Sequence, residues 1–329
     1  MTPHEPAGPS YVRPRVMGAI LSIASCFIIS TNLLVAAALL KLLLKKRSQS
    51  WCFVLNLALA DALVGVAITG LATEDFNSSN GKTQCLMRMA FVTSPCTASI
   101  MSMFLISLDR YAAIKTPLRY SQLSGKGTAV GSLLALWISS LTMGFLPGET
   151  QHSADGYTGF CAFFSVIHQV GMIVLFSACF FPVLSVFLYI YLDILKIACG
   201  HQKQICQVRE AGSRTANHQH YESHYWSHVK ALRTVGVLVG CFLVLWCPFF
   251  VVCIVHLLCE SCELTNVLEN HLWLLGLSNS LINPLVYAFW QKEVRLQLAA
   301  MFSCFTGRPA AGLPGGDSSC YIESQGSPA

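Results

Sequence analysis

Seven apolar stretches divide this chain, each about as long as the roughly 20 residues that a helix needs to cross a bilayer. They cover residues 16–40, 51–72, 86–114, 128–146, 168–197, 229–258 and 267–290. Only 11% of all residues are charged, against about 25% in a soluble domain, which argues against a soluble protein. Inside lipid, backbone groups must bond to one another, and the sequence lacks the short alternating strands of a barrel. We therefore predict an all-α membrane protein, a bundle of seven transmembrane helices.

Basic residues predict the orientation of these helices. Lys and Arg are frequent after the first, third, fifth and seventh stretches and rare on the opposite side. Because cytoplasmic loops carry this excess, we expect the N-terminus outside the cell and the C-terminus inside. The formal net charge of +5 follows from the same bias and requires no nucleic-acid partner. We divide the chain into an extracellular N-terminus (residues 1–15), a membrane domain (16–305) and a cytoplasmic tail (306–329) with the composition of a disordered segment.

Four of the 15 cysteines fall on the extracellular side, where disulfides persist. Each can remain a free thiol, but we favour two bridges, one between Cys259 and Cys262 in a tight loop, and one between Cys85 and Cys161. On the same side, Asn77 begins an Asn-Ser-Ser acceptor for N-glycosylation.

The cytoplasmic side carries two further features. After residue 290, apolar and basic residues alternate, as in a helix that lies on a membrane surface. We predict a short amphipathic eighth helix there, with Cys304 at its end as a candidate palmitoylation site. The loop near residues 198–228 is rich in histidine. This composition can indicate metal binding, but a solvated loop is the favoured interpretation.

Polar residues inside the apolar stretches carry the functional signal, because a charge at the centre of a bilayer costs about 2.5–3.5 kcal/mol. Asp61 is the acid at mid-depth and needs a partner. The residues at suitable depths are Asn32, Ser99, Asn279 and Asn283. The third stretch ends in Asp109-Arg110-Tyr111, where the basic loops place the cytoplasmic surface. Other stretches are marked by Trp137, Pro182, Trp246-Cys247-Pro248 and Asn283-Pro284-Leu285-Val286-Tyr287.

These motifs occur in order, one set per stretch, and the pattern resembles the rhodopsin-like (class A) G-protein-coupled receptors over residues 16–305. The stretches "LNLALADALVGVAITGL" and "LWLLGLSNSLINPLVYAFWQKEVRLQL" are similar to members of that class that respond to N-acylethanolamides and lysophospholipids. The resemblance implies a receptor in the plasma membrane that activates the stimulatory G protein and raises cyclic AMP. It also implies arrestin and a receptor kinase as partners.

The same resemblance assigns roles to individual residues. Asp109 would hold Arg110 in the resting state, and Arg110 would turn toward the G protein on activation. The coupling region would also include Tyr111, His228 and Lys230. The family's sodium and activation site would comprise Asn32, Asp61, Ser99, Asn279, Asn283 and Tyr287. A carboxylate among hydroxyl and amide oxygens suits a hard cation, so an allosteric sodium ion, bound by Asp61, is the one cofactor we expect.

The class of ligand follows partly from residues that are missing. Leu277 stands where opsins carry their Schiff-base lysine, and Val92 stands where amine receptors carry an aspartate. The residues expected around the ligand are mostly apolar, and such a cavity suits an acyl chain. They are Phe91, Val92, Ser94, Pro95, Phe164, Trp246, Phe249, Phe250 and Trp273. Arg88 and Glu269 either orient a polar head group or simply lie at the membrane interface.

Two alternatives to this lipid receptor remain open, another receptor of the class and a transporter, whereas an enzyme is not expected. A receptor of the same class can bind another small apolar ligand and couple to a different G protein. A transporter would show internal repeats and charged groups at its midplane, and an enzyme would need paired catalytic groups in the spans; the sequence offers neither. In the receptor interpretation, His228 stands where many members carry an acid that clamps the arginine. We therefore predict high basal activity.

Overall fold

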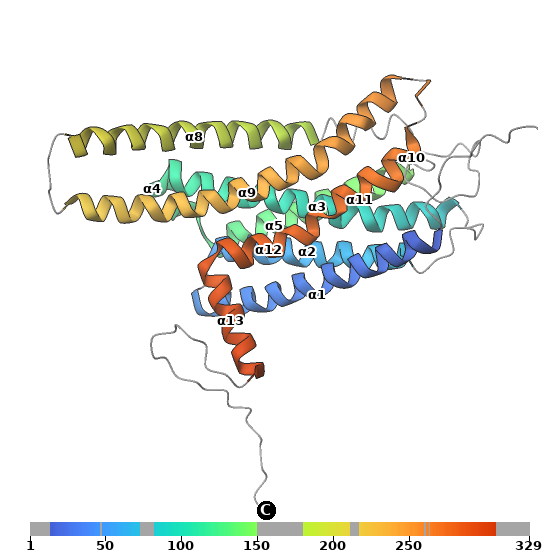
Figure 1. The fold of residues 1–329 in the computed structure, drawn as a ribbon, viewed down its shortest axis with the longest axis horizontal. Helices are drawn as coiled ribbons and strands as arrows, with labels where there is room; N and C mark the ends of the chain where they lie inside the picture. The colour runs from blue at the N-terminus through green and yellow to red at the C-terminus, as the bar shows by residue number, and fades with distance from the viewer. Residues whose placement is uncertain are drawn as a thin grey trace, which may run out of the picture.

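The computed structural model describes residues 14–46, 48–72, 82–149, 180–210, 217–259, 261–262 and 264–306, and these residues form helices and short connections without a strand. Long helices run alongside one another as a bundle (Figure 1). The first half of the chain contributes α1 (Pro14–Lys46), α2 (Gln49–Ala72), α3 (Lys82–Lys115), α4 (Pro117–Leu123) and α5 (Lys126–Glu149). The second half contributes α8 (Phe181–Glu210), α9 (Asn217–Leu258), α10 (Thr265–Val267), η2 (Leu268–Leu272), α11 (Trp273–Leu277), α12 (Asn279–Trp290) and α13 (Lys292–Thr306).

Five helices of the described part are long and apolar enough to cross a membrane, namely α1, α2, α3, α5 and α9. The predicted fifth span begins in residues that the structure does not describe, and its described apolar part, Phe181–Asp193, is shorter. The predicted seventh span is not one regular helix. It is divided into α10, the π-helical turn η2, α11 and α12, with a break at Ser278. Pro284 lies within α12, and an interior proline removes one helical hydrogen bond.

Helix α3 lies at the centre of the bundle and contacts α2, α5, α8 and α9. α1 packs along α2, and α12 packs against α1, α2 and α9. α13 turns away from the bundle axis after α12 (Figure 1) and contacts α1. Its buried residues are Val294 and Leu298, whereas Phe302 is exposed, as expected of an amphipathic helix.

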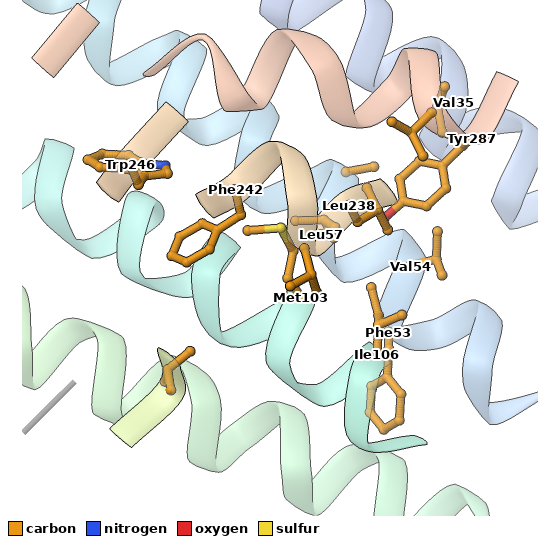
Figure 2. Packing of buried hydrophobic residues seen from close by; sticks show 14 of the residues in the cluster. Val35, Phe53, Val54, Leu57, Met103, Ile106, Leu238, Phe242, Trp246 and Tyr287 are labelled. Atoms are coloured by element: carbon orange, nitrogen blue, oxygen red, sulfur yellow. The ribbon is translucent and has the colours of Figure 1, made fainter. Parts of the chain in front are cut away.

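The core is formed by apolar side chains from helices that are far apart in sequence. Figure 2 shows Val35, Leu57, Met103, Phe242 and Tyr287 pointing into a common interior. Many large apolar residues lie on the outer surface instead, for example Phe27, Val66 and Val244, each more than half exposed. Such an apolar exterior would be unfavourable in water and fits a helix bundle that faces lipid.

Candidate functional site

A buried carboxylate lies at the centre of the bundle. Asp61 on α2 is 0% exposed and accepts three hydrogen bonds from side chains of α3 and α12. Ser99 Oγ donates to Oδ1 at 2.7 Å, Ser280 Oγ donates to Oδ1 at 2.8 Å, and Asn283 Nδ2 donates to Oδ2 at 2.8 Å. These dipoles compensate for the water that the carboxylate has lost, and they tie three helices together.

The structure brings only part of the predicted set to this carboxylate. Asn32 donates to the carbonyl oxygens of Ile28 and Ser280, both at 2.9 Å, so it reaches Asp61 only through Ser280. Asn279 directs its amide nitrogen to Met103 Sδ at 4.0 Å. Of the four candidate partners, Ser99 and Asn283 bond Asp61 directly, and Asn32 and Asn279 do not. Sequence reasoning missed Ser280, although it precedes Asn283 by three positions and thus shares its helix face.

Three buried oxygen atoms of α12 are of the kind that binds a cation together with a carboxylate such as Asp61. Among the described residues, Asn279 Oδ1, Asn283 Oδ1 and Tyr287 Oη are buried without a hydrogen-bond partner. Together with the Asp61 carboxylate and the Ser99 hydroxyl they are hard oxygen ligands of the kind that alkali and alkaline-earth ions prefer. No group of three or more His, Cys, Asp or Glu side chains converges in the described part of the chain. The donor set therefore fits a sodium ion better than a transition metal.

A second polar cluster lies at the predicted cytoplasmic end of α3. Arg110 donates to Asp109 Oδ2 through Nη2 at 2.7 Å and Nε at 3.1 Å. Ser50 Oγ donates to the same oxygen at 2.7 Å, and Tyr120 Oη on α4 donates to Oδ1 at 2.8 Å. We predicted that Asp109 alone would hold Arg110. Among described side chains it is the only carboxylate on Arg110, but two hydroxyls that the sequence did not point to fix its position.

A further acid that sequence reasoning missed joins α3 to α8. Asp193 Oδ2 accepts from Tyr111 Oη at 2.7 Å and from Lys115 Nζ at 2.5 Å. The ring of Tyr111 also packs edge-on against Tyr189, with centroids 6.3 Å apart. The sequence could have indicated Asp193, because an acid near the end of an apolar stretch needs a partner. His228 and Lys230 lie in α9, but their side chains fall outside the described part.

An apolar cavity of about 90 Å³ opens between α3, α8, α9 and α11. Of the residues expected around the ligand, those that line it are Val92, Trp246, Phe249, Phe250 and Trp273. Arg88, Ser94 and Pro95 do not line it. Phe91 is 60% exposed on the outer face, against Phe145 with centroids 5.8 Å apart, so its predicted place in the pocket was wrong. Phe164 and the side chain of Glu269 lie outside the described residues.

The cavity also has lining residues that sequence reasoning did not single out. They are Met89, Thr93, Cys96, Thr97, Ile100, Met101, Phe180 and Val183. Residues of α3 recur there at intervals of three and four, which is the period of one helix face. An apolar helix offers the same composition to lipid and to a cavity, so the sequence did not reveal which face this is.

Trp246 lies between the cavity and the packed interior. Its ring is 5.9 Å from that of Phe250 and 5.9 Å from that of Phe249, and Phe250 stacks on Phe180 at 3.6 Å. A Cβ atom at Gly276 would lie 2.7 Å from the indole ring, so the indole rests on the backbone of α11. Figure 2 shows Phe242 near Trp246 and Met103 beside Phe242, leading toward the core.

Trp137 belongs to a structural network away from the cavity. Its Nε1 donates to Asn56 Oδ1 at 2.9 Å, and Asn56 Nδ2 donates to Ser102 Oγ at 2.8 Å. Ser102 in turn donates to the carbonyl oxygen of Ala98 at 2.6 Å. This chain fixes α5 and α2 against α3, and Asn56 is another member that the sequence did not identify.

The cysteines that we predict to be extracellular are bonded where the structure describes them. Cys259 and Cys262 form a disulfide with a Cα–Cα distance of 5.4 Å. Cys85 is disulfide-bonded, and Cys161, its predicted partner, lies outside the described residues. Asn77 and the side chain of Cys304 also lie outside them.

Comparison with known proteins gives consistent matches over most of the chain. The seven-transmembrane receptor family of the rhodopsin type matches residues 31–287. The human glucose-dependent insulinotropic receptor is 46% identical over 288 residues, which cover 86% of this chain and 85% of that receptor. Mouse G-protein coupled receptor 3 is 29% identical over 91% of this chain and 87% of its own length. The human histamine H2 receptor is 27% identical over 78% of this chain and 71% of its own length.

Proposed function

Because the chain belongs to the rhodopsin family of seven-transmembrane receptors, we propose that it is a receptor for lipid-like agonists, with N-acylethanolamides and lysophospholipids as the ligand class. Membership makes it a multi-pass protein of the plasma membrane with an agonist and a G protein as partners, and not an enzyme. It also sets aside the transporter interpretation. The proposed output is activation of the stimulatory G protein and a rise in cyclic AMP. The N-terminus is proposed to be extracellular and the C-terminus cytoplasmic.

The observation that carries the ligand class is the apolar lining of the cavity. Val92, Phe249 and Phe250 face it, and no described lining residue is charged. The histamine H2 receptor is named for an amine ligand, but an amine needs a counter-ion, and Val92 offers none. A cavity of about 90 Å³ is smaller than the 300–1,000 Å³ of pockets for drug-sized ligands. The described part thus accommodates a narrow segment such as part of an acyl chain.

The proposed mechanism connects the cavity, the buried Asp61 and the Asp109–Arg110 pair in succession. An agonist in the cavity contacts the indole of Trp246 and displaces it from its resting position against Gly276. The shift passes through Phe242 and Tyr287 toward Asp61. Sodium, held there by Asp61, Ser99 and the neighbouring amide oxygens, would stabilise the resting packing. When that packing loosens, Arg110 leaves Asp109 and becomes available to the G protein.

The resting state is proposed to be only weakly held. The Asp109–Arg110 contact joins adjacent residues, and the Arg110 side chain is 29% exposed. A pair of this kind typically contributes under about 1 kcal/mol. With His228 in the position of the usual acid, we propose appreciable signalling without ligand. Arrestin and a receptor kinase are proposed as the partners that end it.

The proposal is tested by measuring cyclic AMP in transfected cells with and without oleoylethanolamide or an oleoyl lysophospholipid. We expect a raised basal level that rises further with either lipid, and no response from Arg110→Ala at the same surface expression. An unchanged cyclic AMP level with both lipids would contradict the ligand class. A response through another second messenger would instead favour a receptor of this family that couples to a different G protein.

A further inference from the structure

Two threonines in the cavity wall are unlike the serines of α3. Ser94, Ser102 and Ser107 each donate to the carbonyl oxygen four residues earlier, at 2.6–2.8 Å, which is the usual arrangement for a hydroxyl inside a helix. Thr93 and Thr97 line the cavity. Among the described residues, neither threonine hydroxyl has a hydrogen-bond partner within the protein.

The spacing of these hydroxyls defines a possible ligand contact. Thr93 and Thr97 are four positions apart, so they lie on one face of α3 with their Cβ atoms about 5–6 Å apart. An O–H···O hydrogen bond is about 2.7–2.8 Å long. One oxygen atom placed between the two side chains can therefore accept from both hydroxyls at once.

The surroundings select the chemistry of that oxygen. Thr93 and Thr97 provide the hydroxyls of the described lining, and the rest consists of aliphatic, aromatic and sulfur-bearing side chains. The indole N–H groups of Trp246 and Trp273 are the other strong donors that the lining residues carry. A charged group would lack a counter-ion here, whereas a neutral acceptor with two lone pairs satisfies both hydroxyls.

We propose that Thr93 and Thr97 form a subsite for the amide or ester carbonyl of an acyl lipid. This inference rests on the proposed function and adds the ligand group that the cavity recognises. The carbonyl oxygen lies between the two hydroxyls, and the adjoining chain occupies the apolar surface formed by Ile100, Met101 and Val183. A site built to hydrogen-bond a ligand group discriminates strongly against an analogue without it, because its polar groups are then left unpaired.

The test compares two lysophosphatidylcholines with identical chains, one with an ester link and one with an ether link that lacks the carbonyl. Potency is measured as cyclic AMP at matched surface expression, together with competition binding on membranes. The net contribution of one hydrogen bond to binding corresponds to about a fivefold change in affinity. We therefore expect the ester lipid to be about 5- to 25-fold more potent on the unmodified receptor.

Substitutions at Thr93 and Thr97 test whether these two residues cause the ester preference. Thr93→Val/Thr97→Val keeps the side-chain volume and should abolish the ester preference, so that the two lipids have about the same potency. The change should come mainly from a lower potency of the ester lipid. Thr93→Ser/Thr97→Ser should retain that preference. Thr142→Val is the matched control, because Thr142 is exposed on α5 and donates to the Ile138 carbonyl oxygen at 2.9 Å. If the double valine variant is poorly expressed, each single variant should lose about fivefold.

The outcomes separate this inference from the proposed function. Equal potency of ester and ether lipids on the unmodified receptor, or an ester preference that survives both valine substitutions, would overturn the carbonyl subsite and leave the lipid receptor standing. No response to either lipid, and no binding, would overturn the proposed ligand class and the subsite with it.

Discussion

Replacing Gly276 with alanine perturbs the contact on which Trp246 rests. The added Cβ would lie 2.7 Å from Cε3 and Cζ3 of the indole and 2.9 Å from Cδ2. Carbon atoms pack at about 3.5–4.0 Å, so the ring has to move by about 0.8 Å or more. Phe249 and Phe250 pack against it, and the open direction is the cavity. The substitution thus displaces Trp246 from its resting position against α11, as we propose for an agonist, but by a push from α11 rather than from the cavity.

The size of the effect follows from the cost of overpacking. Inserting a methyl group into a packed interior typically costs about 1–3 kcal/mol. This cost raises the free energy of the resting state, in which Asp109 holds Arg110. The cost is removed when the indole moves away from α11. The ratio of active to resting receptor should then rise by about 5- to 150-fold while the active fraction remains small.

The assay is basal cyclic AMP at matched surface expression, with Gly240→Ala on α9 as the control. A Cβ at Gly240 has no atom within 4 Å, so that variant should keep the original basal level. Gly276→Ala should raise it, because the displaced indole favours the active state. An unchanged or lower basal level in Gly276→Ala would refute the idea that the position of Trp246 sets the resting equilibrium.

Three further predictions concern the polar clusters. Tyr120→Phe removes one hydrogen bond from Asp109, about 1 kcal/mol, and should raise basal cyclic AMP up to about fivefold; a level equal to wild type would show that Tyr120 does not fix the acid. Asp61→Asn keeps the volume but not the charge, so agonist affinity should become the same in sodium chloride and choline chloride, and a persisting difference would place the ion elsewhere. His228→Glu supplies the missing acid and should lower basal cyclic AMP while agonist still acts; no change would exclude that position as the cause.

The sequence predicted much of the helical architecture because lipid restricts the chain so strongly. Long apolar stretches without water must be helical, and the helices α1, α2, α3, α5 and α9 contain the corresponding predicted stretches. The seventh predicted stretch was harder, since length and hydropathy do not reveal a π-helical turn such as Leu268–Leu272 or a break at Ser278. Such breaks depend on neighbouring helices that accept the irregular backbone.

Placement of side chains was only partly predictable. Asp61 was identified because an unpaired acid in a membrane is costly, but the rotation of α12 decides that Ser280 rather than Asn279 reaches it. The error at Phe91 has a different cause. In a soluble protein a polar face marks the outside of a helix, whereas lipid and a ligand cavity both favour apolar residues. The orientation of α3 therefore had to come from the structure.

The central claim is that an acyl lipid in the cavity switches this receptor toward the stimulatory G protein through Arg110. The most direct measurement is guanine-nucleotide exchange on the purified stimulatory G protein, with the purified receptor in lipid nanodiscs and with or without oleoylethanolamide or oleoyl lysophosphatidylcholine. We predict measurable exchange without lipid, faster exchange with lipid, and neither with Arg110→Ala. Exchange that neither lipid accelerates, or that Arg110→Ala leaves unchanged, would contradict the claim.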